Sequence, residues 1–120
     1  MSGMSEMTAT PGRSLDEDRT TELERLAGLR REYDEVVAAA EGANGDDEHD
    51  PEGSTIAYER SQIAAFITQA EEHLAEIEAA QRRIADGTYG LCEMCGDAIP
   101  DGRLEARPTA RTCMAHAAQR

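Results

Sequence analysis

Three cysteines and one histidine near the C-terminal end of the sequence form the pattern with the clearest chemical meaning. They occur as two short pairs, Cys92-Glu-Met-Cys95 and Cys113-Met-Ala-His116, with seventeen residues between the pairs. A structural zinc ion takes four thiolate or imidazole ligands in a tetrahedron, and each short pair can supply one edge of it. No βαβ pattern surrounds the first pair, as it would at a thioredoxin-like redox site. The spacing therefore predicts one zinc ion held by Cys92, Cys95, Cys113 and His116.

This zinc site is expected to be structural, because four protein ligands leave no coordination position for water. A zinc deaminase would also need a His-x-Glu sequence, and neither His49 nor His73 lies in one. We therefore expect that the protein is not an enzyme. Gly96, directly after Cys95, fits a tight turn in which a side chain would obstruct the approach of backbone N–H groups to sulfur. The alternative for His116 is a surface histidine, with solvent or another residue as fourth ligand.

The composition indicates a protein with little hydrophobic core. The 120 residues include one Phe, three Tyr and no Trp, and a small domain of this kind usually needs a staple such as a metal ion. Three cysteines are an odd number for a disulfide framework, and zinc-binding thiolates must stay reduced, which indicates the cytoplasm. No apolar stretch has the length of a signal peptide or a membrane span, so no membrane association is expected.

The charge indicates a protein partner. The formal net charge is -13, and all twelve cationic residues are arginine. Proteins that bind duplex DNA neutralise its phosphates with Lys and Arg, so direct DNA binding is not expected.

Two long amphipathic helices are predicted ahead of the cysteines. Residues 1–13 lack periodicity and are expected to be a disordered tail, whereas Ser14-Leu-Asp-Glu17 is a capping-box pattern that starts a helix. Residues 42–54 are rich in helix breakers and acids and are expected to form a loop. Apolar residues at coiled-coil spacing mark the two helices: Leu26, Leu29, Tyr33, Val36 and Ala40 in the first, and Ile56, Ile63, Ile67, Ala70, Leu74, Ile77 and Ile84 in the second.

The predicted fold is therefore mainly α. Residues 14–87 should form a long antiparallel coiled-coil hairpin with an acidic tip loop at 42–54, and residues 88–120 a small zinc finger with a short terminal helix. Asp86-Gly87 ends the second helix, because glycine readily adopts the left-handed conformation of a C-cap. The short loop favours an intramolecular hairpin and hence a monomer. Pairing of each helix with another copy of the chain is the alternative.

The segment from Gly87 to Cys113 closely resembles the zinc finger of the DksA/TraR family of bacterial transcription regulators. Matching residues are Tyr89-Gly90, Cys95-Gly96, Ile99 and the run from Arg103 to Pro108. The family places a long antiparallel coiled coil directly ahead of the finger, with Asp-Pro at its tip, and Asp50-Pro51 lies at the corresponding distance before Cys92.

The resemblance implies a protein that binds bacterial RNA polymerase directly. In the family, the coiled coil enters the secondary channel of the polymerase, and acidic tip residues modulate initiation. The candidate tip residues here are Asp46, Asp47, Glu48, Asp50 and Glu52. Arg103, Arg107 and Arg111 are candidates for contacts with the channel rim, with pairing to Glu105 and to hairpin acids as the alternative. For the acidic loop, the alternative is a solvated segment that keeps the protein soluble.

The sequence departs from the family pattern at three places. His116 replaces a fourth cysteine, and Gly53 stands where the tip has a second acid. Positions that help bind the alarmone ppGpp fall near Gln69 and Glu76, and only Arg107 matches, so a response to ppGpp is not expected. The alternative function is a zinc-stapled coiled-coil adaptor that binds another protein.

Overall fold

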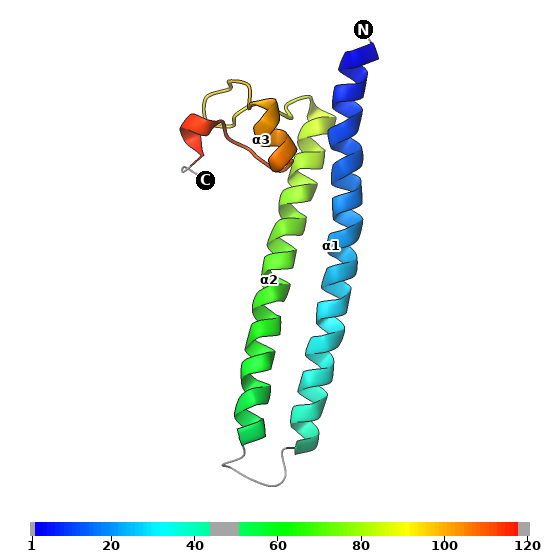
Figure 1. Cartoon of the computed structure of the whole chain (residues 1–120), viewed down its shortest axis with the longest axis vertical. Coiled ribbons are helices and arrows are strands. Elements are labelled where there is room, and N and C mark those ends of the chain that lie inside the picture. The colour runs from blue at the N-terminus through cyan, green and yellow to red at the C-terminus, as the bar shows by residue number, and fades with distance from the viewer. Residues whose placement is uncertain (1, 44–50, 118–120) are drawn as a thin grey trace. The chain divides into compact units, whose positions relative to one another are not determined.

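The protein is built from two long helices followed by a small irregular domain (Figure 1). The computed structural model describes residues 2–43 and 51–117, with side chains for 12–41 and 55–117. The long helices are α1 (Ser2–Ala43) and α2 (Pro51–Asp86), and the short ones are α3 (Asp101–Ala106) and a 3₁₀ turn, η1 (Met114–His116). Among these residues, the one β pairing is an isolated antiparallel bridge between Leu91 and Ala98. The prediction of a mainly α fold is confirmed.

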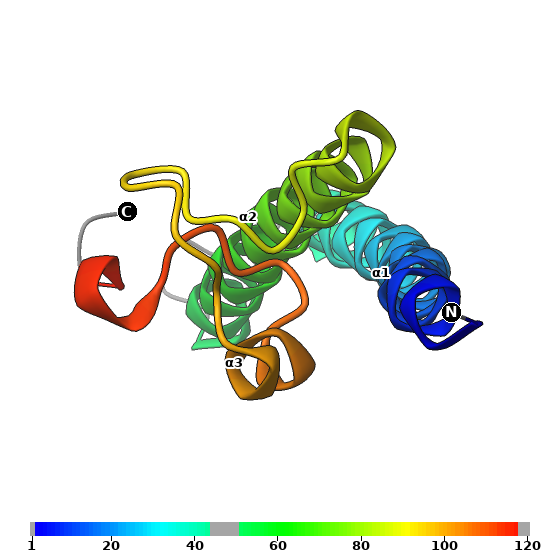
Figure 2. The same cartoon turned by 90° about the horizontal axis from the view of Figure 1, so that it is seen from above.

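The chain divides into two compact units. The first combines residues 1–20 with 74–120, and the second comprises residues 21–73. Each unit therefore contains a part of α1 and a part of α2, and the short elements belong to the first unit, where they follow the end of α2 (Figure 2). Nowhere in the described residues is a helix apolar over a length sufficient to cross a membrane.

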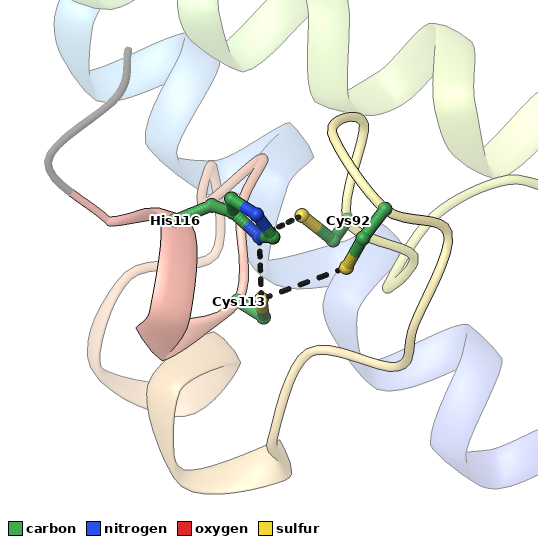
Figure 3. Close-up of side chains that lie close together, drawn as sticks. Cys92, Cys113 and His116 are labelled. Atoms are coloured by element: carbon green, nitrogen blue, oxygen red, sulfur yellow. Dashed lines mark hydrogen bonds between the residues drawn. The ribbon is translucent and has the colours of Figure 1, made fainter.

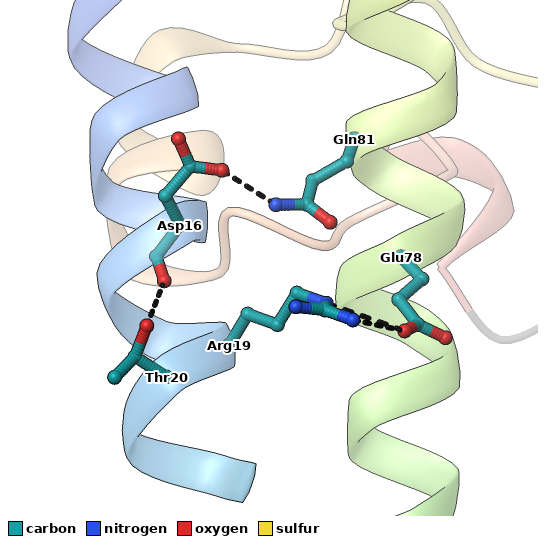
Figure 4. A network of polar contacts seen from close by, with 5 residues as sticks. All are labelled: Asp16, Arg19, Thr20, Glu78 and Gln81. Atoms are coloured by element: carbon teal, nitrogen blue, oxygen red, sulfur yellow. Dashed lines mark hydrogen bonds and ion pairs between the residues drawn. The ribbon is translucent and has the colours of Figure 1, made fainter.

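In both units α1 and α2 lie side by side and run in opposite directions. In the first unit, Arg19 Nε and Nη2 lie 3.3 and 3.2 Å from Glu78 Oε2, and Gln81 Nε2 donates to Asp16 Oδ1 over 2.6 Å (Figure 4). In the second unit, Arg30 Nη2 donates to Glu71 Oε2 over 2.8 Å. Partner numbers fall on α2 as they rise on α1, which confirms the antiparallel hairpin.

Both long helices extend further than the sequence predicted. The first begins at Ser2 rather than Ser14 and so includes the segment expected to be a disordered tail. Adding a residue to an existing helix costs much less than nucleating one, so a segment without apolar periodicity can still continue α1. The second begins at Pro51, inside the predicted loop. Proline is favoured at the first position of a helix, where no intrahelical partner for its missing N–H is needed.

The best-packed apolar cluster lies in the first unit. Leu15, Ile77 and Ala80 are completely buried there, and Ile84 and Tyr89 pack against them. Leu15 was not among the predicted seam residues, although it lies eleven residues before Leu26, at a spacing that continues the seam.

The predicted seam is confirmed in the second unit, where it is less deeply buried. Leu26 and Ala70 are buried, and the remaining predicted seam residues of this unit are half-buried: Leu29, Tyr33, Val36, Ala40, Ile56, Ile63 and Ile67. Intermediate burial is the normal result when only two helices pack, because each seam residue has neighbours on one side.

A carboxylate occupies one seam position of the second unit. Glu22 lies four residues before Leu26 and is only 7% exposed. Its Oε2 lies 2.8 Å from Nδ1 of His73 on α2, and its Oε1 accepts a hydrogen bond of 3.3 Å from Arg25 Nη1. No residue of this kind was predicted in the seam, since glutamate is rarely buried unless it is paired.

Two substitutions of Glu22 should separate the effect of removing its charge from the effect of removing its side chain. Glu22→Leu should raise the free energy of unfolding by about 1 kcal/mol, because leucine adds apolar contacts in the seam while His73 and Arg25, both about half exposed, can be hydrated instead. Glu22→Ala should lower it by about 1–3 kcal/mol through the lost hydrogen bonds and contacts. Urea unfolding of both variants measures this, and equal destabilisation by Leu and Ala would contradict the expectation.

Candidate metal centre

The zinc finger begins where α2 is capped by glycine. Gly87 has φ +80°, a conformation that costs glycine little and other residues more. The N–H of Thr88 donates to the carbonyl of Arg83 over 2.9 Å, and the N–H of Gly87 donates to that of Ile84 over 3.2 Å. These two bonds are those of a Schellman motif. The predicted end of the helix at Asp86-Gly87 is therefore confirmed, and the chain turns there towards the cysteines.

The first cysteine pair lies on a tight turn closed by the Leu91–Ala98 bridge. The N–H of Cys92 donates to the carbonyl of Asp97, and the N–H of Gly96 donates to that of Cys92, both over 2.8 Å. Gly96 has φ +79°, and a Cβ atom built on it would meet nothing within 4 Å. Glycine is thus required here by the backbone conformation, and the expected obstruction by a side chain is wrong.

The second pair lies on the 3₁₀ turn and is joined to the first by the backbone. The N–H of Glu93, between the first two cysteines, donates to the carbonyl of Arg111 over 2.9 Å. Cys113 precedes η1, and the N–H of His116 donates to its carbonyl over 3.1 Å. A single 3₁₀ turn brings residues three apart to the same side, so Cys113 and His116 both face the first pair (Figure 3).

The four candidate ligand atoms lie within 4.8 Å of one another. The separation of Cys95 Sγ and Cys113 Sγ is 3.8 Å, and His116 Nδ1 lies 3.7 Å from Cys92 Sγ and 3.3 Å from Cys113 Sγ. With Zn–S near 2.3 Å and Zn–N near 2.0 Å, a tetrahedron has S···S edges of about 3.8 Å and S···N edges of about 3.5 Å. These three edges match this geometry to within about 0.2 Å, so the residues fit one structural zinc ion.

The surroundings of the thiols favour a thiolate at Cys92. Burial opposes ionisation of Cys92, but hydrogen bonds from the backbone of Cys113, Cys95 and Met94 outweigh it and lower the pKa to about 6. At Cys95, the backbone of Asp97 favours the thiolate, but burial and the neighbouring thiols raise the pKa to about 11. Cys95 would hold a zinc ion as the thiolate, so binding of the ion would release the proton that Cys95 otherwise keeps.

The histidine and the third cysteine favour each other's charged forms. The hydrogen bond from His116 lowers the pKa of the Cys113 thiol, and the same bond raises the pKa of the His116 imidazole. Because a metal-binding imidazole must be neutral, binding of a zinc ion here would release the proton that this pair holds on His116.

The finger is attached to α2 through Tyr89, two residues after the helix cap at Gly87. Tyr89 packs against the cluster of Leu15, Ile77 and Ala80, and its hydroxyl donates to the carbonyl of Pro108 over 2.8 Å. Burial raises the pKa of this hydroxyl, so it stays a donor. Within the finger, the buried residues besides Cys92 are Ile99, Ala110 and Thr112. This core is too small to stabilise the fold of the finger without a bound metal ion or a covalent cross-link.

Two of the three candidate rim arginines have partners inside the finger. Arg103 Nε donates to the carbonyl of Thr112 over 2.9 Å, and Arg111 Nε lies 3.9 Å from Glu93 Oε1. Neither pairs with Glu105, the partner named above as an alternative to the channel rim. Arg107 is exposed and has no ion pair within the described part of the chain.

The candidate tip residues lie largely beyond the described part of the chain. Asp46, Asp47, Glu48 and Asp50 are outside the described residues, and Glu52 belongs to α2 although its side chain is not described.

The fold and the site define a helical-hairpin protein that ends in a structural zinc finger. Residues 87–115 match the family model described as the prokaryotic dksA/traR C4-type zinc finger. The finger of this chain is therefore of the dksA/traR type. The match stops one residue before His116, which stands in the place of the fourth cysteine of a C4 site.

Similar proteins occur in several bacteria. The chain is 42% identical to the uncharacterized protein YteA of Bacillus subtilis over 73 residues, covering 61% of this chain and 30% of YteA. It is 36% identical to general stress protein 16O of the same organism over 87 residues, covering 72% of this chain and 53% of the other. The chain thus spans about half or less of the length of these relatives.

One further protein is similar in sequence over a short segment, and another is similar in structure over most of the chain. The RNA polymerase-binding transcription factor DksA of Caulobacter vibrioides is 54% identical over 37 residues, covering 31% of this chain and 26% of DksA. The structure of transcription factor DksA2 from Pseudomonas aeruginosa has a TM-score of 0.76 at 24% identity, covering 93% of this chain and 81% of DksA2. This second match shows a shared fold.

Proposed function

We propose that this protein regulates transcription by binding RNA polymerase directly, with its acidic-tipped coiled coil inserted into the secondary channel to modulate initiation. The observation that carries the proposal is the combination of a family-type zinc finger with a long antiparallel hairpin. The similarity to a relative named as an RNA polymerase-binding factor supports the choice of partner.

The distribution of charge supports a protein channel as the binding site. Residues 21–73 contain fourteen acidic residues and four arginines, so most of the net charge of -13 falls in this segment. Such a segment is repelled by nucleic acid phosphates but can enter a positively lined protein cavity. We assign the tip function to Asp50 together with Asp46, Asp47, Glu48 and Glu52.

In this proposal the zinc finger is a structural module and has no catalytic part. Cys92, Cys95, Cys113 and His116 hold the zinc ion and so preserve the fold of the finger next to the hairpin. Arg107 is the arginine we assign to a rim contact, because Arg103 and Arg111 have partners within the finger. A regulator of this kind acts in the cytoplasm and is not an enzyme.

Purified bacterial RNA polymerase provides the test. The full chain should co-purify with polymerase and change the yield of transcripts in vitro. Replacing Asp50 by Asn and the four neighbouring tip acids by amides should abolish the effect on transcription, because the charge that reaches the catalytic centre is lost. Glu105→Gln, which removes an exposed acid of the finger, is the control and should behave as the wild type. Unchanged transcription by the tip variant would contradict the tip mechanism.

The second candidate function is a zinc-stapled coiled-coil adaptor for another protein. It is favoured by Gly53, which occupies the position of the second tip acid. Photo-crosslinking from residues 46–52 separates the two functions. Insertion into the channel gives products near the polymerase active centre, whereas an adaptor gives none there.

A further inference from the structure

Two exposed aromatic residues lie on α2 at helical spacing. Tyr58 is 64% exposed and Phe66 is 41% exposed, and Gln62 lies midway between them. Residues four apart lie on the same side of a helix. The chain has only four residues of the Phe, Tyr and Trp types, and two of these four are exposed to solvent on α2. We refer to Tyr58, Gln62 and Phe66 as the aromatic face.

Packing of the hairpin does not account for this face. In the same stretch of α2 the seam is formed by Ile63, Ile67 and Ala70, which are half-buried or buried. The aromatic face lies to one side of that seam. Phe66, three residues after Ile63 and four before Ala70, borders the seam, and Tyr58, five residues before Ile63, lies further round the helix. Phenylalanine is among the residues most often found inside proteins, and the one Phe of this chain is left substantially exposed.

Two side chains of the aromatic face, Tyr58 and Gln62, are restricted before any partner binds. Gln62 Nε2 donates to the hydroxyl oxygen of Tyr58 over 3.1 Å, which restricts the rotation of both side chains. A side chain that is already restricted loses less entropy when a partner covers it. Tyrosine and phenylalanine are typical anchors in protein interfaces, where they fill recesses of the partner.

The charge around the face restricts what can cover it. It belongs to the unit of residues 21–73, which has ten more acidic than basic residues. A second copy of the chain would bring two strongly acidic surfaces together, and a nucleic acid or an anionic membrane would be repelled in the same way. A basic protein surface is attracted instead.

We propose that the aromatic face of α2 is a docking surface for a basic protein groove with apolar recesses. Identifying that groove with the wall of the RNA polymerase channel rests on the proposed function above. Tyr58 and Phe66 anchor the contact, and the surrounding acids steer the approach of the partner and align it.

Affinity of the full-length, zinc-loaded chain for RNA polymerase tests this inference. Tyr58→Ser combined with Phe66→Ser should weaken binding about tenfold or more, as loss of interface anchors does. Tyr58→Phe, which keeps the ring, should bind nearly as tightly as the wild type. Leu23→Ser is the matched control, because Leu23 is 37% exposed on α1 of the same unit. Its affinity should be unchanged, and circular dichroism should show that all variants are folded.

The possible failures can be told apart. If the wild-type chain does not bind polymerase, the proposed function fails together with this choice of partner. If the wild type binds and the double variant binds equally well, the docking face alone is overturned. An equal loss in Leu23→Ser would also overturn it, because the effect would not belong to this face. Sedimentation showing a wild-type dimer and a monomeric double variant would overturn it in favour of self-association.

Discussion

Removal of zinc should unfold residues 88–117 while most of the helical signal persists. Structural zinc sites supply about 10–16 kcal/mol of apparent binding free energy in small finger peptides, which is folding free energy for the residues around them. The finger here has four buried residues, Cys92, Ile99, Ala110 and Thr112, and cannot replace that contribution by apolar packing. The helices α1 and α2, with 42 and 36 residues, lie outside the metal site.

Chelator titration followed by two methods measures this effect. Amide NMR signals of the finger should collapse to random-coil positions, while far-UV circular dichroism should fall only slightly, because α3 contributes six α-helical residues. Elemental analysis should find one zinc ion per chain before chelation and none after it.

Variants of the fourth ligand provide a matched pair for the same test. His116→Cys supplies a thiolate and should keep zinc with its affinity little changed. His116→Ala should weaken zinc binding by more than the ~10–100-fold that loss of an outer-shell partner costs. Retention of zinc by His116→Ala at wild-type affinity would contradict the assignment of His116 as a ligand, and solvent or another residue would then complete the site.

The zinc site could be predicted because the residues that define it lie close together in the sequence. Two short pairs and the glycine after Cys95 determine which atoms can meet, and the structure brings all four ligand atoms within 4.8 Å. The hairpin could be predicted for a similar reason, since apolar residues such as Leu26 and Ile63 repeat at fixed spacing along each helix.

Other features could not be predicted, because they depend on contacts distant in the sequence. The burial of Glu22 becomes understandable only with His73 beside it, 51 residues later. Arg103 was expected to contact the channel rim or to pair with Glu105 or hairpin acids, yet its guanidinium donates to the carbonyl of Thr112 and so stabilises the approach to Cys113. The helix boundaries at Ser2 and Pro51 likewise depend on whether a neighbouring helix can be extended, which composition alone does not reveal.

Ile77→Ala should be among the most destabilising single substitutions in the hairpin. Ile77 is completely buried between Leu15 and Ala80, and Tyr89 packs against the same cluster. Truncating a fully buried isoleucine to alanine costs about 2–5 kcal/mol, since the lost apolar contacts are joined by a cavity. A protein of this size has a total stability of about 5–15 kcal/mol, so the loss removes a large part of it.

The matched control for this substitution is Ile63→Ala. Ile63 lies fourteen residues earlier on α2, at the same heptad position, but is only half-buried. Its truncation should lower the urea midpoint less, because solvent already reaches part of the side chain. Equal midpoint shifts in the two variants would show that the stability of the hairpin is spread evenly along its seam. A larger shift in Ile77→Ala, accompanied by weakened protection of the amides near Tyr89, would instead tie the cluster to the attachment of the finger, since the Tyr89 hydroxyl holds the carbonyl of Pro108 from that position.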